Sequence, residues 1–150
     1  MAAYNKFYAT VEHFLIKTHD LIGTSGSDAD ALKAYLSNAV PSAAADAVKG
    51  DMAEITNENG YTAPVGLDNV GSRTDGTVTV TAKSFTVTAT GSVGPFQYVA
   101  IYNDTATAPA DALICWYDYA SALTLADGES FTVKFNGANV GSNGTLFTLA

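Results

Sequence analysis

Side chains that commonly carry chemistry are few in this 150-residue chain, and their spacing favours structural roles. His13 and His19 are six residues apart, and on a helix only residues three or four apart share a face. We therefore expect two surface or half-buried imidazoles rather than a metal pair. The single cysteine, Cys115, lies between Ile114 and Trp116, as a small buried apolar residue would. A cysteine nucleophile needs His and Asp or Asn partners, and both histidines are distant in sequence.

The carboxylates and short motifs also predict no reaction. Asp127 and Glu129 share one turn, but two side chains are too few to define a Ca²⁺ site. The sequence has no glycine-rich phosphate loop, no Cys-x-x-Cys, no His-Glu-x-x-His and no Gly-x-Ser-x-Gly. We expect a protein that is not an enzyme and that holds neither a cofactor nor a metal.

The charge of the chain bears on its partners. Its formal value is −8, from 15 acidic and 7 basic residues. Nucleic-acid backbones are normally bound by clustered lysine and arginine. Here the basic residues are scattered: Lys6, Lys17, Lys33, Lys49, Arg73, Lys83 and Lys134. The N-terminus lacks the pattern of a signal peptide, and no run approaches 18 apolar residues. We expect synthesis in a cytoplasm, with neither nucleic acid nor a membrane as a partner.

The first element that would position these side chains is an amphipathic helix over 4–22. Apolar residues recur there at steps of three and four, which indicates one face of a helix. The stripe comprises Phe7, Val11, Phe14, Thr18 and Leu21, widened by Leu15 and Ile22. Gly23 ends the helix, and the following Thr-Ser-Gly-Ser predicts a turn. We interpret this segment as a helical arm that docks on the core or on a partner.

The rest of the chain, 31–150, predicts a β-rich body. Strand-period alternation or continuous apolar runs predict strands at 32–40, 77–82, 85–89, 96–102, 113–117, 123–125, 131–135 and 145–149. The apolar parity changes near Lys83-Ser84, which indicates a bulge or a break. The runs 96–102 and 113–117 are apolar on both faces, which is typical of central strands covered on both sides. Asp127-Gly128 predicts a hairpin-like turn between 123–125 and 131–135.

Three segments rich in small and polar residues predict loops: 62–76, with room for one irregular strand, 103–111 and 136–144. We expect these loops and the helix to make the functional contacts. Residues 1–150 form one domain. The predicted fold is mainly β: an antiparallel β-sandwich or jelly-roll-like domain with one N-terminal amphipathic helix.

Aromatic side chains between Val93 and Phe135 allow three interpretations. The set is Tyr98, Tyr102, Trp116, Tyr117 and Tyr119. Burial in the core, anchoring of a protein interface and stacking on sugar rings all use Tyr and Trp. The core is favoured, and a carbohydrate-binding module remains an alternative. The expected core comprises Phe96, Tyr98, Ile101, Trp116, Phe131 and Val133.

Several segments together resemble small virion structural proteins of tailed bacteriophages, and they cover nearly the whole chain. They are Tyr4-Asn-Lys-Phe7 with Val11-Glu12 and Lys17-Thr-His19-Asp-Leu21; Leu32 to Pro41; Glu54-Ile55 with Asn59-Gly-Tyr-Thr62; Gly94-Pro-Phe-Gln-Tyr98 with Tyr102-Asn-Asp; Leu113-Ile with Trp116-Tyr-Asp-Tyr119; and Leu125-Ala-Asp-Gly-Glu-Ser-Phe-Thr-Val133. No single motif is diagnostic, but their order is moderately specific.

The resemblance implies a non-enzymatic, late structural protein of the virion. Its most specific implication is a capsid decoration (cement) protein that binds the outside of the major capsid protein shell and stabilises it. Such proteins are homo-oligomers, commonly trimers, made in the host bacterial cytoplasm and located on the capsid exterior. The alternative within the same resemblance is a tail-tube, tail-tip or fibre-associated protein. Candidate capsid or subunit contacts are Tyr4, Phe7, Val11, Phe14, Tyr61, Arg73, Asn103 and Asp104.

Overall fold

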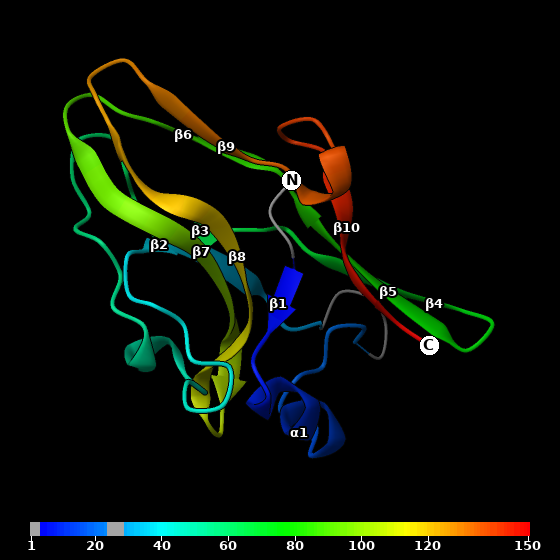
Figure 1. Ribbon diagram of the computed structural model, residues 1–150. Helices are drawn as coiled ribbons and strands as arrows, with labels where there is room; N and C mark the ends of the chain where they lie inside the picture. Colours follow the sequence, from blue (N-terminus) through cyan, green and yellow to red (C-terminus); the bar gives the residue numbers. More distant parts are fainter. Residues whose placement is uncertain (1–3, 24–28) are drawn as a thin grey trace.

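The computed structural model describes residues 4–23 and 29–150 (Figure 1). These residues form antiparallel sheets, with one α-helix near the N-terminus, which confirms the predicted fold class. No helix in the described part of the chain is long and apolar enough to span a membrane. The turn predicted at 24–27 lies outside the described residues.

The largest sheet has five strands in the order β1-β8-β7-β2-β3. They are β1 (Tyr4–Lys6), β8 (Ala110–Leu125), β7 (Val93–Thr107), β2 (Leu32–Ser37) and β3 (Val65–Gly66). The long strands β7 and β8 lie at its centre and curve together through the body in Figure 1. This confirms the prediction of two central strands at 96–102 and 113–117, and the two are neighbours in the sheet.

A second layer packs on one face of this sheet. It contains a three-stranded sheet in the order β10-β5-β4 and the strand pair β6-β9. The strands are β4 (Val70–Thr74), β5 (Thr77–Lys83), β6 (Phe85–Thr88), β9 (Ser130–Val133) and β10 (Asn143–Leu149). The two-layer arrangement is sandwich-like, and the β4–β5 hairpin points away from the body at the right of Figure 1.

Ser84 is the point where the chain passes from one part of the second layer to the other. β5 pairs with β10, whereas β6 pairs with β9. The buried Ser84 side chain accepts a hydrogen bond from the Phe135 amide at 3.1 Å. The parity change predicted near Lys83-Ser84 is therefore confirmed, and its cause is the change of partner strand.

Alternating side chains of β7 reach two different cores. Val99 and Ile101 pack between the two layers, and Tyr98, Ala100 and Tyr102 pack on the opposite face. Residues 42–54, which include the 3₁₀ turn η1 (Lys49–Asp51), cover that opposite face. They form bridges to β8 at Ala112 and to β2 at Ser37. Burial on both faces explains why the central strands are apolar at nearly every position.

The N-terminal segment corrects the predicted helix over 4–22. Residues 4–6 form β1, with Tyr4 opposite Tyr117 of β8, and the helix α1 covers only Ala9–Leu15. Beyond it, Lys17 adopts a left-handed conformation at φ 61° and ends the helical path. Apolar periodicity alone does not distinguish one long helix from a strand followed by a short helix, because the two in succession can share apparent steps of three and four.

Two predicted boundaries in the central region are also wrong. β7 continues to Thr107 and β8 begins at Ala110, so 103–111 is mostly strand with a tight turn. Residues 123–125 are the end of β8 rather than a separate strand. Register shifts around Ala120, which has φ 73°, let β8 curve without ending.

The turn at Asp127-Gly128 does not close a hairpin. β8 before it pairs with β7, and β9 after it pairs with β6.

The expected loop at 62–76 contains β3 and β4, and Asp75-Gly76 forms a true hairpin turn into β5, with φ 48° and 81°. The expected loop at 136–144 contains the end of the 3₁₀ turn η2 (Phe135–Gly137) and the start of β10.

Gly144 offers a test of the close packing between η2 and β10. A Cβ at this buried position would fall on the carbonyl oxygen of Phe135, so Gly144→Ala should destabilise the protein by about 2 kcal/mol. Gly50→Ala is the matched control, because nothing lies within 4 Å of the added methyl group. Denaturant unfolding would measure both variants. Equal stability of the two would contradict the packing described here.

Candidate functional site

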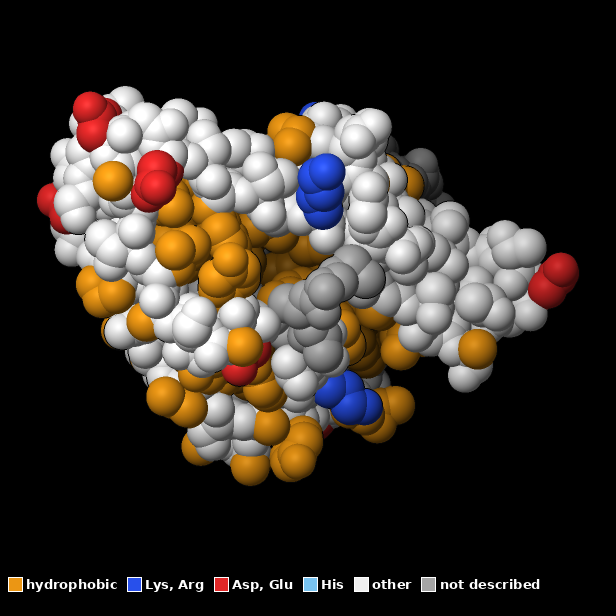
Figure 2. Space-filling model, turned by 45° about the horizontal axis from the view of Figure 1, so that its top comes forward, with side chains coloured by type: hydrophobic (Ala, Val, Ile, Leu, Met, Phe, Trp, Pro, Cys, Tyr) orange, Lys and Arg blue, Asp and Glu red, His pale blue; other side chains and the backbone are white. Residues whose placement is uncertain are grey.

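An open apolar groove of ≈580 Å³ lies between the two layers. Figure 2 shows it as a hollow in which hydrophobic side chains are visible. We call it the aromatic groove, and its lining is Tyr4, Val99, Tyr117, Tyr119, Phe131, Thr132, Val133, Lys134, Phe135, Asn136, Gly137, Thr145 and Leu146. The groove opens where β1 is the outermost described strand of one layer and β9 borders the other.

Strand pairing brings the aromatic rings of the groove together. Tyr4 lies opposite Tyr117 across the β1–β8 ladder, and their rings meet edge to face at 6.1 Å. The Tyr117 ring is 6.0 Å from that of Phe135, and the Tyr119 ring is 5.6 Å from that of Phe131. Burial raises the pKa of Tyr4 and of Tyr117, so both hydroxyls stay protonated and cannot act as bases.

Helix α1 carries a second uncovered apolar surface. We call this surface the outer face of α1. It comprises four side chains that are 47–80% exposed: Tyr8, Val11, Leu15 and Ile16. The first three follow the steps of three and four residues that place side chains on one side of a helix. A cluster of large exposed apolar side chains is typical of a contact surface.

The inner side of α1 is unusually polar. A β-bulge at Ile114 arises because Ile101 pairs with Cys115 while Tyr102 pairs with Leu113. The carbonyl of Ile114 accepts hydrogen bonds from the Thr10 hydroxyl at 2.8 Å and from the Phe7 amide at 3.2 Å. These polar contacts hold the helix to β8, Phe14 packs against the core, and the residues of the outer face remain exposed.

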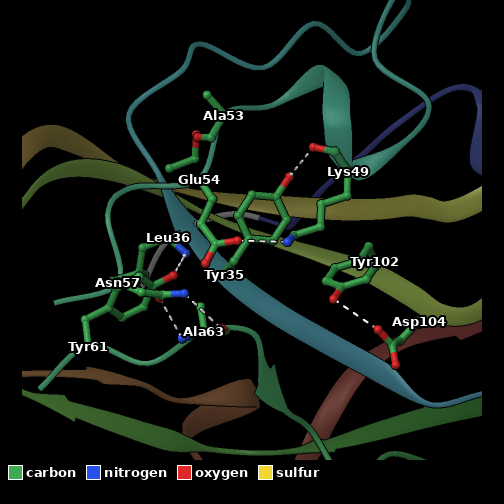
Figure 3. A network of polar contacts seen from close by, with 11 residues as sticks. Tyr35, Leu36, Lys49, Ala53, Glu54, Asn57, Tyr61, Ala63, Tyr102 and Asp104 are labelled. Carbon is green, nitrogen blue, oxygen red and sulfur yellow. Dashed lines mark hydrogen bonds and ion pairs between the residues drawn. The ribbon is translucent and has the colours of Figure 1, made fainter.

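A polar network covers the far face of the main sheet (Figure 3). The Lys49 ammonium lies 5.4 Å and 5.5 Å from the ring centres of Tyr35 and Tyr102, and it pairs with Glu54 at 2.8 Å. Two cation–π contacts and an ion pair hold this lysine in place. Burial raises the pKa of Tyr35, Tyr61 and Tyr102, so their hydroxyls remain donors. The network anchors residues 49–61 and presents no nucleophile.

The prediction of two separate, surface or half-buried histidines is wrong, because His13 and His19 form a buried pair. Their rings meet edge to face at 5.4 Å, because the chain turns back after the short helix α1. The Asn103 amide nitrogen lies 3.1 Å from His19 Nδ1 and 2.6 Å from the Asp30 carboxylate. Burial lowers the pKa of His19 to about 4, and His13 adds to the shift while Asp30 opposes it. Among the described residues, no three His, Cys, Asp or Glu side chains could hold a metal ion.

Three of the candidate contact residues are buried, which corrects the prediction that they lie at a contact surface. Phe7 is in the core beside the Trp116 ring at 4.6 Å, and the Tyr61 hydroxyl accepts a hydrogen bond from the Leu36 amide at 2.8 Å. The side-chain oxygen of Asn103 accepts hydrogen bonds from the backbone amides of Thr105 and Ala106, which follow it in β7. Each of these side chains stabilises the fold from inside.

The remaining candidates lie at or near the surface. Tyr4 lines the aromatic groove, and Val11 is on the outer face of α1. Arg73 is exposed on β4, and Asp104 on β7 pairs with Lys33 at 2.7 Å, which lowers the pKa of the Asp104 carboxyl. Phe14 is half-buried between other rings. The structure therefore does not bring the predicted contacts into one site.

The expected core residues are mostly interior. Phe96, Tyr98, Ile101 and Val133 are buried, whereas Trp116 and Phe131 are partly buried. Cys115 is fully buried, as the sequence predicts, and burial raises the pKa of its thiol above its usual range. A neutral, inaccessible thiol is a packing group rather than a nucleophile.

The sequence predictions did not include Tyr8 and Ile16, which cap the two ends of α1, as contact residues. They also placed Leu15 in the core-facing stripe rather than on the outer face. The signal was present, because Tyr8, Val11 and Leu15 form a second stripe on the same helix. No protein family, curated protein or solved structure matches this chain.

The His13–His19 pair gives a pH-dependent prediction. The imidazole of His19 titrates near 6.5 when unfolded and near 4 when folded, so folding favours its neutral form. Stability should fall by about 2 kcal/mol as the pH drops from 6.5 towards 4, because protons then favour the unfolded chain. Urea unfolding of wild type and of His19→Gln at pH 7 and pH 4.5 would measure this.

His19→Gln removes the His19 imidazole and leaves the two titratable groups that face it, His13 and Asp30, in place. The difference in pH dependence between the two proteins therefore reports on His19. We expect a clearly weaker pH dependence in His19→Gln than in wild type. An identical dependence in both proteins would show that His19 does not titrate as the buried geometry requires.

Proposed function

We propose that this protein is a non-enzymatic structural component of a bacteriophage virion, and specifically a decoration protein on the outside of the capsid. The proposal joins two independent supports. One is the resemblance of segments along nearly the whole chain to small phage virion proteins. The other is a β-rich body that carries an uncovered apolar surface suited to permanent contact.

The observation that carries the proposal is the outer face of α1. Four large apolar side chains point away from the body, while the inner side of the helix is secured by hydrogen bonds to β8. Covering a Val, Leu or Ile side chain is worth about 1.5–3 kcal/mol. A few such side chains are therefore sufficient for a small protein to attach to a larger surface, and we assign this face to the major capsid protein.

The chemistry of the described residues is consistent with a structural role. Tyr35 in the polar network stays protonated, and the Cys115 thiol is enclosed. The His19 imidazole is buried against His13 and the Asn103 amide. The polar-network tyrosines, the thiol and the imidazoles are all absent from the described lining of the aromatic groove. These features support a structural binding protein best.

Contacts between copies are part of the same proposal. The β4–β5 hairpin projects from the body and ends in a tight turn, with exposed Val70 and Arg73 along β4 (Figure 1). A projecting hairpin can reach a neighbouring copy without distorting the fold. We assign it to subunit contacts in a homo-oligomer, a trimer being the state that the resemblance implies.

Two alternatives make different predictions about the particle. A tail-tube, tail-tip or fibre-associated protein would use the same apolar face at a different place in the virion. A carbohydrate-binding module would instead depend on exposed rings, and the most exposed ones are Tyr8 on α1, at 64%, and Tyr119 at the groove, at 51%. The Trp116 ring, which would be the strongest sugar platform, packs on Phe7 instead.

Charged substitutions on α1 test the proposed attachment. Val11→Asp combined with Leu15→Glu should reduce co-sedimentation with capsids of the encoding phage at least tenfold, as expected for the loss of about 1.4 kcal/mol or more of apolar contact. Both side chains are exposed, so the fold should change in stability by less than about 0.5 kcal/mol.

Val40→Asp serves as the control, because Val40 is as exposed as Leu15 but lies outside α1. It should bind capsids as wild type does. Wild-type binding by the double variant would refute the assignment of α1, and failure of the wild-type protein to bind capsids would refute the decoration role.

A further inference from the structure

We propose that the aromatic groove is a binding site for a small amphipathic carboxylate, of the class of medium-chain fatty acids. The apolar chain would lie between the two layers, and the carboxylate would meet Lys134 at the rim. This proposal stands on the groove alone and does not depend on a role in the virion.

The size and lining of the groove match a ligand site. Its ≈580 Å³ falls within the range of about 300–1,000 Å³ that is typical of small-molecule pockets. Five aromatic side chains and the aliphatic groups of Val99, Val133 and Leu146 provide its walls. Predominantly apolar and aromatic walls of this kind are typical of small-molecule sites.

Charge selects the kind of ligand. The one charged side chain that lines the groove within the described chain is Lys134, and no described carboxylate lines it. This is notable in a protein of net charge −8. Lys33, Lys49 and Lys83 each have a carboxylate partner, whereas Lys134 has no ion pair to any residue that the structure describes.

A second lysine lies on the same side of β1 as the groove. Tyr4 and Lys6 are two residues apart in a strand, so their side chains project to one face, and Tyr4 lines the groove. Figure 2 shows Lys or Arg side chains near the hollow, and Asp or Glu side chains as well. Among the described lining residues the charge is that of Lys134, which can meet an anionic group at the rim.

The balance of polar and apolar groups favours this ligand over other small molecules. The neutral hydrogen-bonding groups of the lining are Thr132, Asn136, Thr145 and the hydroxyls of Tyr4, Tyr117 and Tyr119, and the remaining walls are apolar, which suits a sugar less well than an alkyl chain. A nucleotide would need several basic groups for its phosphates, and Lys134 is the one charged side chain among the described lining residues. A cation would meet Lys134 with the wrong charge. An apolar chain with a single carboxylate fits both the walls and the rim.

Titration of the full 150-residue chain with decanoate, below its critical micelle concentration, tests the proposal. Methyl NMR should show saturable shifts at Val99, Val133 and Leu146, with Kd in the millimolar range or tighter. Val11, Leu15 and Ile16 report on the outer face of α1 in the same spectra. Shifts centred on those residues, or no saturable shift in the groove, would overturn the proposal.

Two variants separate the charge from the walls. Lys134→Gln should weaken decanoate binding about three- to fivefold, in line with an exposed ion pair, and Lys17→Gln should leave it unchanged. Tyr119→Ala should weaken binding about three- to tenfold, with Tyr8→Ala as its control. All four side chains are exposed, so the variants should fold, and circular dichroism would verify this.

The charge-reversed probe decyltrimethylammonium completes the experiment. It has the same chain and should bind the groove at least fivefold more weakly than decanoate. Equal affinity for the two probes, or equal effects of Lys134→Gln and Lys17→Gln, would overturn the carboxylate assignment.

Discussion

The pairing of β7 with β8 is the constraint on which the rest of the structure depends. These strands, 15 and 16 residues long, form the centre of the main sheet and are covered on both faces. Every apolar side chain along them needs a partner layer, and every buried polar group needs a hydrogen bond. One face receives β5, β6, β9 and β10, and the other receives residues 42–54 with Phe7. The bulge at Ile114 exposes a carbonyl that Thr10 and Phe7 satisfy, so the same strand pair also fixes the position of α1.

The two candidate binding surfaces arise where this covering is incomplete. Thr10 and Phe14 dock α1 and leave the residues of its outer face exposed, which produces a convex apolar surface. The two layers separate near β1 and β9, which produces a concave one. Their shapes suit different partners: a convex cluster fits the surface of a larger protein, and a groove with a lysine at its rim fits a small anion. One fold can therefore carry both without conflict.

Much of the architecture could be predicted from local patterns. Continuous apolar runs identified the central strands, and the parity change at Lys83-Ser84 identified the change of sheet partner. The helix was overestimated because periodicity cannot show that Tyr4–Lys6 pairs with a strand more than 100 residues away. The same limit applies to the groove, whose walls come from β1, β7, β8, β9, η2 and β10. Its rings are distant in sequence, and only long-range register brings Tyr4, Tyr117 and Phe135 together. His13 and His19 meet for a similar reason, since the turn at Lys17 overrides helical spacing.

The proposed decoration role can be tested by cryo-electron microscopy of the assembled phage particle. We expect many copies on the outside of the head lattice, with the outer face of α1 against the major capsid protein and the β4–β5 hairpin directed towards neighbouring copies. Density for this protein at the tail, or its absence from the particle, would refute the proposed role.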